Sequence, residues 1–525
     1  MKPAADICML LEGTYPYVRG GVSSWVHQVI AGLPELRFSL VFVGGRRADY
    51  GPLRYTLPDN VVHLETHYLE DSFKEPSTAR GGRTRFSESH ALHEYLKVLS
   101  GRARCPIARV RELAVSVDAL LTTLGSPRGL SLKDFLTSPL AWAHIRQAHL
   151  SGDPEASFVD YFWTLRLMHG PIFQLARIAE DAPPAGVYHT VSTGYAGFLG
   201  CLIERRRSAP LVLSEHGIYT KERRIDLNQA DWLDKLSGAV EPGWAGPGQP
   251  LRELWIRFFE SLGRLTYRSA TPIISLYEGN RSRQLQDGAD PARTRVIVNG
   301  ISAERFAAAL AQRPADVPKV IGLIGRVVPI KDVKTFVRAV RHVIAKVPEA
   351  EGWVIGGADE DPAYEQECRA LARSLGVEDK LKFLGHRDVA EILPQLGLLM
   401  LTSISEAQPL AILEAFAAGV PCIATDVGAC RAQIEGGSPD DRALGLAGRV
   451  APFADAEALA QAAVELLSSR DAWHACQRAG LARVRRHYTV DHMLSEYRSV
   501  YANALGAPST RARVATLNTL NRLEA

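Results

Sequence analysis

The 525-residue chain is too long for one ordinary hydrophobic core, so we expect at least two large domains. Its composition, 46% hydrophobic and 23% charged residues, is that of a soluble globular protein. The formal net charge of only +3 gives no support for binding a polyanion, so nucleic acid is not an expected partner.

The cysteines and the N-terminus indicate a cellular compartment. The seven cysteines are widely scattered, and several lie inside apolar runs. That scatter fits neither a disulfide framework nor a zinc site, and it is typical of a reducing cytoplasm. No signal-peptide pattern opens the chain, and no apolar run approaches the roughly 18 residues of a spanning helix. We therefore expect a cytoplasmic protein.

In the first half of the chain, short apolar runs alternate with amphipathic stretches. This alternation predicts βαβ units and a parallel sheet. We expect strands at residues 6–11, 38–44, 60–65, 186–191, 210–217, 272–277 and 295–300. Between about 68 and 185 the spacing becomes helical, which predicts a largely helical insertion.

After a predicted linker at 307–320 the alternation restarts. We expect strands at 320–325, 352–357, 381–386, 398–403 and 421–428, with helices that start at or near Asp332, Pro362, Asp388 and Pro409. The segment from about 456 to 505 is helical throughout. The polar residues from Gly506 to the end are expected to be loose.

The predicted fold class is α/β, with two doubly wound Rossmann-like domains that face a cleft. The first domain spans 1–310 and carries the insertion at 68–185, and the second spans 318–488. A C-terminal helix at 489–505 is expected to cross back to the first domain. Because open α/β sheets bind ligands beyond the carboxyl ends of their strands, the functional residues should follow strands.

The loop after the first strand carries Gly20 and Gly21 directly before an apolar helix. Glycines there let backbone amides approach a ligand and aim a helix N-terminus at an anion. A plain strand-to-helix turn explains the pair equally well. The chain contains neither G-x-G-x-x-G nor G-x-x-x-x-G-K-[ST], which argues against a nicotinamide dehydrogenase and a P-loop kinase.

In the stretch "IGRVVPIKD", Arg326 and Lys331 follow a buried strand that ends at Gly325. Two cations at the carboxyl edge of a parallel sheet, beside a helix N-terminus, can bind a diphosphate. Ordinary solvated surface charges are the alternative.

Residues 404–421, "ISEAQPLAILEAFAAGVP", hold two glutamates on either side of a proline. Because Pro409 is tolerated only in the first helical turn, the helix begins near it, and Glu406 lies in the preceding loop. Glu414 lies between one and two turns inside the helix. Its neighbours in sequence are apolar, and a buried carboxylate requires partners.

Two further features have more than one interpretation. His216 ends a strand of the first domain, where it is either a cleft residue or a structural histidine. Asp359 and Asp361 form an Asp-x-Asp pair, a pattern of carboxylates that can bind manganese. Because the pair leads into Pro362, a helix-capping loop is favoured.

Together these motifs resemble the retaining glycosyltransferases of family 4, which have the GT-B architecture. Glu406 and Glu414 meet the family pattern of two glutamates with seven residues between them, and "AFAAGVPCIATDVGA" resembles the run that follows it. The arginine–lysine pair and the N-terminal glycine pair match as well. "EGTYPYVRGGVSSWVHQVI" and "SEHGIYTKERRIDL" resemble, more narrowly, the Pel exopolysaccharide glycosyltransferase subfamily.

The resemblance implies a role for each residue of the second domain. Arg326 and Lys331 would hold the donor diphosphate and stabilise the leaving group. Glu414 would bond the ribose, and Glu406 the donor sugar. The residues expected to bind the donor also include those of the neighbouring loops, namely Gln408, Leu410, His386 and Arg387, the last two near the base.

In the first domain, the resemblance implies that His216 faces the sugar and that Gly20 and Gly21 leave room for phosphate and acceptor. The expected catalytic residues are thus Glu406, His216, Arg326 and Lys331. No metal or other cofactor is implied.

The implied activity is transfer of a hexose, with retention, from UDP-hexose or UDP-N-acetylhexosamine to a growing polysaccharide. The implied partner is an inner-membrane polysaccharide synthase complex, which would place the protein at that membrane's periphery. Many relatives have glycine-aromatic-glycine where this chain has Ala407, Gln408 and Pro409, so the sugar preference stays open. Three alternatives remain: a non-catalytic scaffold of the complex, a sugar-nucleotide epimerase of the same fold, and a phosphorylase.

Overall fold

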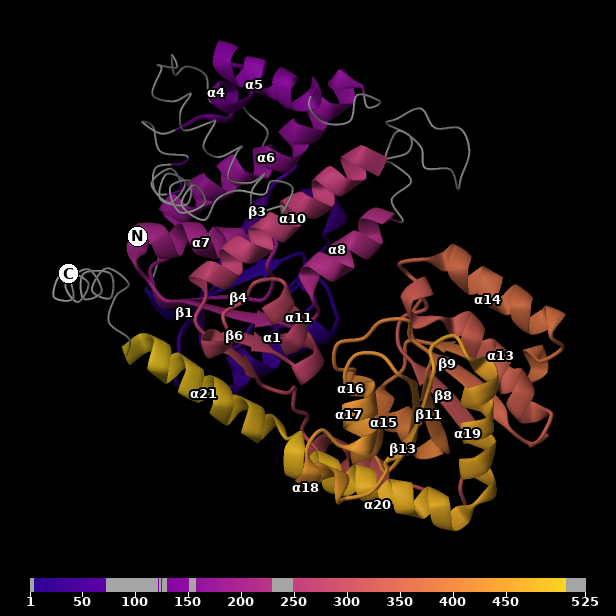
Figure 1. The fold of residues 1–525 in the computed structure, drawn as a ribbon. Helices are drawn as coiled ribbons and strands as arrows, with labels where there is room; N and C mark the ends of the chain where they lie inside the picture. Colours follow the sequence, from indigo (N-terminus) through magenta and orange to yellow (C-terminus); the bar gives the residue numbers. More distant parts are fainter. Residues whose placement is uncertain are drawn as a thin grey trace. The chain divides into compact units, whose positions relative to one another are not determined.

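The computed structural model describes residues 4–71, 121, 124, 130–150, 157–228 and 249–506. They divide into two compact units, drawn in Figure 1. Unit 1 takes the described residues up to Ser275, Arg281–Arg295 and those from Tyr497 on. Unit 2 takes Leu276–Asn280 and Val296–Glu496. Each unit is built around one open sheet, which confirms the predicted α/β class with two doubly wound domains.

The sheet of unit 1 has seven strands in the order β3-β2-β1-β4-β5-β6-β7, and β1 to β6 pair in parallel. The chain runs from β1 to β2 and β3, then returns to β4 on the other side of β1. The strand order therefore reverses between β1 and β4, although the two strands are parallel. All seven strands lie where the sequence predicted them: β1 (Ala5–Glu12), β2 (Phe38–Gly44), β3 (Val61–Tyr68), β4 (Ala185–Thr190), β5 (Leu211–Glu215), β6 (Ile273–Ser275) and β7 (Thr294–Val296).

Helices cover both faces of this sheet (Figure 1). One face packs under α6 (Phe158–Asp181), α7 (Tyr195–Arg207) and α10 (Gln249–Ser269), and this is where the main apolar core lies. The described residues also form α1 (Gly21–Gly32), α4 (Leu132–Thr137), α5 (Pro139–Leu150), α8 (Tyr219–Asn228) and α11 (Glu278–Gln286). Helices α4 to α6 fall within the predicted insertion, and the rest of that segment lies outside the described residues.

The other face of the sheet holds a buried polar network instead of purely apolar contacts. Ring nitrogens of His189 lie 2.7 Å from the Tyr501 hydroxyl and 2.9 Å from the Ser214 hydroxyl, which lies 2.9 Å from the Tyr497 hydroxyl. Burial, and secondarily His216, lowers the pKa of His189 to about 3, so its imidazole is neutral. The end of α21 (Val490–Gly506) is thus fixed to β4 and β5 by uncharged hydrogen bonds.

Unit 2 has a six-stranded parallel sheet in the order β10-β9-β8-β11-β12-β13. Its strands are β8 (Val320–Ile324), β9 (Glu351–Ile355), β10 (Leu381–Gly385), β11 (Leu398–Leu401), β12 (Cys422–Thr425) and β13 (Gly448–Ala451). The first five were predicted. The sequence analysis missed β13, because a four-residue strand with a glycine and an arginine shows no apolar run.

Four helices of unit 2, α13 to α16, begin at or next to the residues that the sequence predicted. Asp332, Asp361 and Asp388 are N-caps whose carboxylates accept backbone N–H groups, so the capping interpretation of Asp361 is confirmed. The predicted linker at 307–320 was partly wrong, because it begins with a short helix. The helices are α12 (Ala307–Ala311), α13 (Val333–Ile344), α14 (Pro362–Ser374), α15 (Val389–Ile392), α16 (Leu410–Ala417), α17 (Cys430–Glu435), α18 (Pro439–Arg442), α19 (Ala456–Ser468) and α20 (Arg470–His487).

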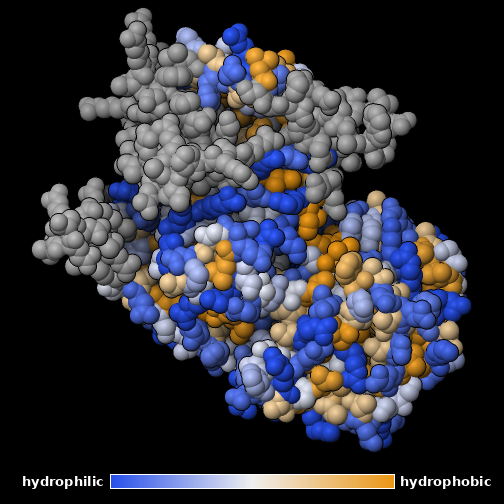
Figure 2. Space-filling model, viewed as in Figure 1, coloured by the Kyte–Doolittle hydropathy of each residue, from blue (hydrophilic) through white to orange (hydrophobic). Residues whose placement is uncertain are grey.

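The visible surface has no single hydropathy. Figure 2 shows hydrophilic side chains interspersed with smaller apolar patches over both units on the visible face. Over the ranges that the structure describes, no helix is both long and apolar enough to cross a bilayer.

Helix α20 is anchored by Arg483, whose side chain is fully buried. Its Nε donates to Asp441 Oδ1 at 2.6 Å, and its terminal nitrogens donate to the carbonyls of Ile434 at 2.6 Å and Gly445 at 2.8 Å. The guanidinium therefore ties α20 to the segment that leads into β13.

Replacing Arg483 by alanine should destabilise unit 2 by about 3–5 kcal/mol, because it leaves the buried Asp441 carboxylate without its cation. Urea unfolding followed by circular dichroism measures the loss. Arg431→Ala is the matched control, since Arg431 pairs with Asp426 and Glu435 at the surface and should lose less than about 1 kcal/mol. Equal losses in the two variants would contradict this account of α20.

Candidate functional site

The strand order of unit 2 reverses between the parallel strands β8 and β11. Open α/β sheets bind ligands beyond the strand ends at such a point. The loops that follow these two strands carry Lys331 and Glu406, and their Nζ and Oε1 atoms are 2.5 Å apart. Only 20% of the lysine side chain and 12% of the glutamate side chain are exposed. The structure thus brings together two predicted residues that are 75 positions apart in sequence.

Short hydrogen bonds hold the two loops against each other. The Thr402 hydroxyl donates to the carbonyls of Lys331 and Asp332, both at 2.9 Å, and the N–H of Ile404 donates to the carbonyl of Ile330 at 2.9 Å. The Ser403 hydroxyl donates to Glu406 Oε1 at 2.7 Å. The sequence analysis missed Thr402 and Ser403, although the change from "LLML" to "TSIS" marks the end of a buried strand.

The loop around Glu406 rests on the segment after β12. The N–H of Ala429 donates to the carbonyl of Ala407 at 2.8 Å. Gly428 has φ +58°, and a Cβ there would lie 2.2 Å from the carbonyl oxygen of Glu406. Any other residue at 428 would therefore be strained and would displace the Glu406 loop.

The Gln408 side chain points into the interior of unit 2. It is 6% exposed, and its Oε1 accepts a hydrogen bond from the N–H of Asn299 at 2.7 Å. The carboxamide therefore supports the loop in this structure, and its role in donor binding stays a prediction. Leu410, the first residue of α16, is partly exposed beside it.

Glu414 lies in the second turn of α16, which begins after Pro409 as predicted. Burial raises the pKa of Glu414, opposed by Arg305 and reinforced by Asp388. Among the described residues, no hydrogen bond reaches its carboxylate. A dehydrated acceptor of this kind gains most from a ligand that brings hydroxyl donors.

Arg326 follows β8 but points to a different carboxylate. Its Nη1 donates to both oxygens of Glu360, at 2.7 and 2.6 Å, and both side chains are about half exposed. Because an exposed ion pair contributes only about 0–1 kcal/mol, Arg326 can exchange Glu360 for a ligand anion easily.

The loop after β10 holds the last two predicted residues of unit 2. His386 Nε2 lies 3.1 Å from Asp359 Oδ2, and both side chains are mostly exposed. Arg387 is exposed beside them. This loop can meet a ligand, but within the described part of the chain no hydrogen bond or ion pair joins it to the Lys331–Glu406 pair.

In unit 1, Gly20 precedes α1 and Gly21 is its first residue. Gly20 has φ 167°, an extended conformation that any residue adopts, and a Cβ on either glycine meets nothing within 4 Å. The packing of unit 1 does not require glycine at these positions. Their effect is to leave the N-terminus of α1 accessible.

His216 follows β5 and is 6% exposed. Its ring packs edge-on against Trp25 of α1, with 4.5 Å between the ring centroids. Burial lowers the pKa of His216 to about 3, so it is a neutral imidazole at physiological pH. The structure gives it a packing role, and its catalytic role stays a prediction.

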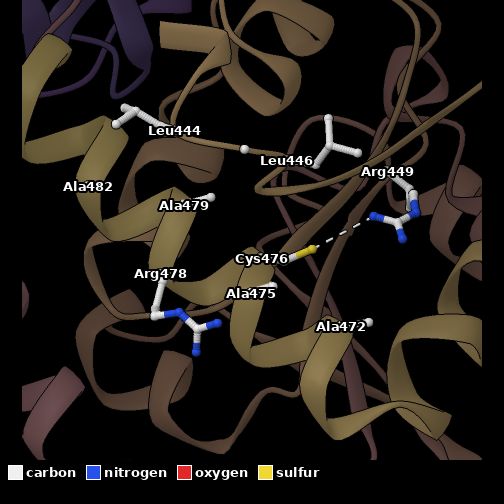
Figure 3. Close-up of a pocket in the computed structure, with 10 residues that line it drawn as sticks. Leu444, Leu446, Arg449, Ala472, Ala475, Cys476, Arg478, Ala479 and Ala482 are labelled. Carbon is white, nitrogen blue, oxygen red and sulfur yellow. Dashed lines mark hydrogen bonds between the residues drawn. The ribbon is translucent and has the colours of Figure 1, made fainter. Parts of the chain in front are cut away.

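A hollow elsewhere in unit 2 contains none of the predicted residues (Figure 3). Its volume is about 560 Å³, and Arg449 Nη1 lies 3.7 Å from Cys476 Sγ on its wall. It offers no carboxylate for sugar hydroxyls. The lining residues are Leu444, Gly445, Leu446, Arg449, Ala472, Ala475, Cys476, Arg478, Ala479 and Ala482.

Two family models match the chain. The model described as a domain of unknown function, DUF3492, matches residues 5–292, and the model described as glycosyl transferases group 1 matches residues 318–469.

Curated proteins match as well. The lipopolysaccharide core biosynthesis mannosyltransferase LpsB of Rhizobium meliloti is 29% identical over 224 residues, which are 40% of this chain and 61% of that protein. A D-inositol 3-phosphate glycosyltransferase of Kribbella flavida is 28% identical over 315 residues, 55% of this chain and 69% of that protein. The chain thus spans about three fifths of the length of the mannosyltransferase.

Solved structures with the same fold include Anabaena Alr3699/HepE in complex with UDP, with a TM-score of 0.56 at 13% identity, covering 95% of this chain and 100% of that one. Sucrose-phosphate synthase from Thermosynechococcus elongatus gives a TM-score of 0.57 at 16% identity, covering 96% and 100%. At these identities the similarity establishes the fold alone, and it confirms the predicted GT-B class.

Replacing Glu414 by glutamine should stabilise unit 2 at neutral pH. Since the folded-state pKa of this carboxyl is raised, its contribution to stability is present below the unfolded-state pKa and is lost as pH rises through the folded-state pKa. The difference in melting temperature between variant and wild type should therefore grow from pH 4 to pH 7.5. A difference that does not change with pH would show that Glu414 is not dehydrated.

Proposed function

The chain belongs to the DUF3492 family, its residues 318–469 match the group 1 glycosyl transferases, and on this basis we propose that it transfers a sugar from a nucleotide-sugar donor to a saccharide acceptor. The observation that carries the proposal is the Lys331–Glu406 pair at the reversal point of the second sheet. It offers a cation for a phosphate and a carboxylate for sugar hydroxyls at one place.

In the proposed complex, the donor diphosphate takes the place of Glu406 on Lys331 and of Glu360 on Arg326. Breaking the bond between sugar and phosphate leaves negative charge on the diphosphate, and positioned cations stabilise that charge in the transition state. Glu406, released from Lys331, accepts hydrogen bonds from the sugar. Glu414 accepts them from the ribose, which satisfies its partly buried carboxylate.

Finer features of the proposal rest on the motif resemblance. We propose UDP-hexose or UDP-N-acetylhexosamine as donor, transfer with retention, no metal, and a growing polysaccharide of the Pel type as acceptor. Association with an inner-membrane synthase complex belongs to the same proposal. Structures of the same fold support the donor class, since Alr3699/HepE was solved in complex with UDP and with UDP-glucose.

Lys331→Ala should weaken UDP binding by about 10- to 150-fold, the effect of losing a charge-assisted hydrogen bond of about 1.5–3 kcal/mol. Isothermal titration calorimetry with UDP measures the change. Lys334→Ala is the matched control, because Lys334 is three residues further on and pairs with Glu367 at the surface.

Wild-type protein that does not bind UDP or any UDP-sugar in a panel would refute the donor class. Equal affinity for UDP in the Lys331→Ala and Lys334→Ala variants would refute the assigned site. Release of an epimerised sugar nucleotide without acceptor would replace the transferase by the epimerase, and donor binding without turnover would favour a scaffold.

Gly21→Ala should leave the melting temperature of unit 1 unchanged or slightly higher, because the added Cβ meets open space and alanine favours a helix by up to about 1 kcal/mol. Turnover of UDP-sugar should fall about tenfold or more if a ligand uses that space. Full turnover at unchanged stability would remove the glycine pair from the site.

A further inference from the structure

The motif "SEHGIYTKERR" holds more than His216, and its other residues meet at the strand ends of unit 1. The strand order of unit 1 reverses between β1 and β4, and Glu12 is the last residue of β1. By the rule that applies to open α/β sheets, this is the expected ligand position of unit 1.

Glu12 occupies the place where an anion would bind. Its Oε2 accepts hydrogen bonds from the N–H of Ala196, in the first turn of α7, at 3.1 Å and from the Ser192 hydroxyl at 3.0 Å. Its Oε1 accepts one from the Tyr219 hydroxyl at 2.8 Å. A carboxylate already fills the favourable electrostatic position at the N-terminus of α7.

The backbone is shaped to allow this contact. A Cβ on Gly194 would lie 2.6 Å from Glu12 Oε2 and 2.4 Å from Cζ of the Tyr219 ring. Only glycine at 194 lets the carboxylate and the phenol approach the start of α7 together.

Arg223 extends the cluster to the surface. Its Nε donates to the Tyr219 hydroxyl at 3.0 Å, and its guanidinium lies over the rings of Tyr219 and Phe259, 5.2 and 5.7 Å from their centroids. The side chain is 42% exposed. Across the described residues, its two terminal nitrogens make no hydrogen bond, and the nearest carboxylate, Asp226, is 3.6 Å from Nη1.

A guanidinium stacked on two rings is held in one orientation with its outer donors available. Beside it, Oε1 of Glu12 accepts one hydrogen bond and retains capacity for another. An outward-facing fork of donors next to a carboxylate acceptor suits adjacent hydroxyl groups, which both donate and accept.

The charge balance argues against an anionic ligand. Arg224, the next residue, bonds Glu260. The other charged groups on α8 and at the strand end are two cations and three carboxylates: Lys221, Arg223, Glu12, Glu222 and Asp226. Burial raises the pKa of Glu222 to about 7, so near neutral pH this group carries about half a charge. The described groups still carry no excess of positive charge that would attract a phosphate or a uronic acid.

We propose that Glu12 and Arg223, held by Tyr219, form a binding site in unit 1 for a neutral, hydroxyl-rich saccharide, with Arg223 as the residue that sets this specificity. Describing that saccharide as the acceptor rests on the proposed transferase function; the binding site does not.

Saturation-transfer NMR on the full chain tests the site. The probes are neutral methyl pyranosides of glucose, mannose and galactose and N-acetylglucosamine, with glucuronate and inorganic phosphate as anionic competitors. At least one neutral probe should bind the wild type, and Arg223→Ala should lower its affinity about tenfold, as expected for one charge-assisted hydrogen bond. Arg223→Lys should not restore binding, because lysine lacks the planar fork.

Arg224→Ala is the matched control and should bind the probe like wild type. Glu12→Gln, with melting temperature checked, should weaken binding in the same way as Arg223→Ala. Absence of binding by all four neutral probes, unchanged affinity in Arg223→Ala, or displacement by phosphate would each overturn the proposal. UDP titration of the same variants separates the saccharide site from the donor site. Arg223→Ala should bind UDP with wild-type affinity. Wild-type protein that binds a neutral probe but does not bind UDP would refute only the donor proposal.

Discussion

The ion pair between Lys331 and Glu406 is the interaction on which the strand ends of unit 2 depend. Both side chains are mostly buried, so each charge needs the other, and removing either partner would leave an uncompensated charge. The hydroxyls of Thr402 and Ser403 fix the two loops in the position that makes the pair possible. In the free protein the pair is neutral overall. A ligand can separate it only by replacing both halves, with an anion for the lysine and hydroxyl donors for the glutamate.

At the equivalent position of its sheet, unit 1 binds a carboxylate with different groups. At its reversal point the carboxylate of Glu12 is bound by a backbone N–H and two hydroxyls, none of which carries a charge. A ligand anion therefore finds no cation here that it could bind in place of Glu12. The two sheets therefore have equivalent topology at their carboxyl edges but opposite chemistry. In the two sites we propose, unit 2 exchanges an internal carboxylate for a phosphate, while unit 1 retains its carboxylate and presents it to hydroxyl groups.

Local rules made much of this predictable from sequence. Apolar runs located twelve of the thirteen strands found in the described residues, and the restriction on Pro409 placed Glu406 in a loop and Glu414 in a helix. Contacts between distant residues were not predictable. Nothing near Gln408 indicates that it bonds Asn299, 109 positions away, and nothing near His216 indicates that Trp25 covers it. Glu12 went unnoticed because a glutamate at a strand end is common, and its donors lie 180 positions or more along the chain.

The segment Ala407-Gln408-Pro409 replaces the glycine-aromatic-glycine of many similar enzymes, and its geometry bears on sugar preference. The backbone at Ala407 accepts the N–H of Ala429, Gln408 is turned inward, and Pro409 caps α16. All three residues are held by contacts within unit 2. The segment therefore supports the loop, and in the proposed complex discrimination between sugars at this loop falls to the Glu406 carboxylate and to the backbone that Gly428 allows it to adopt.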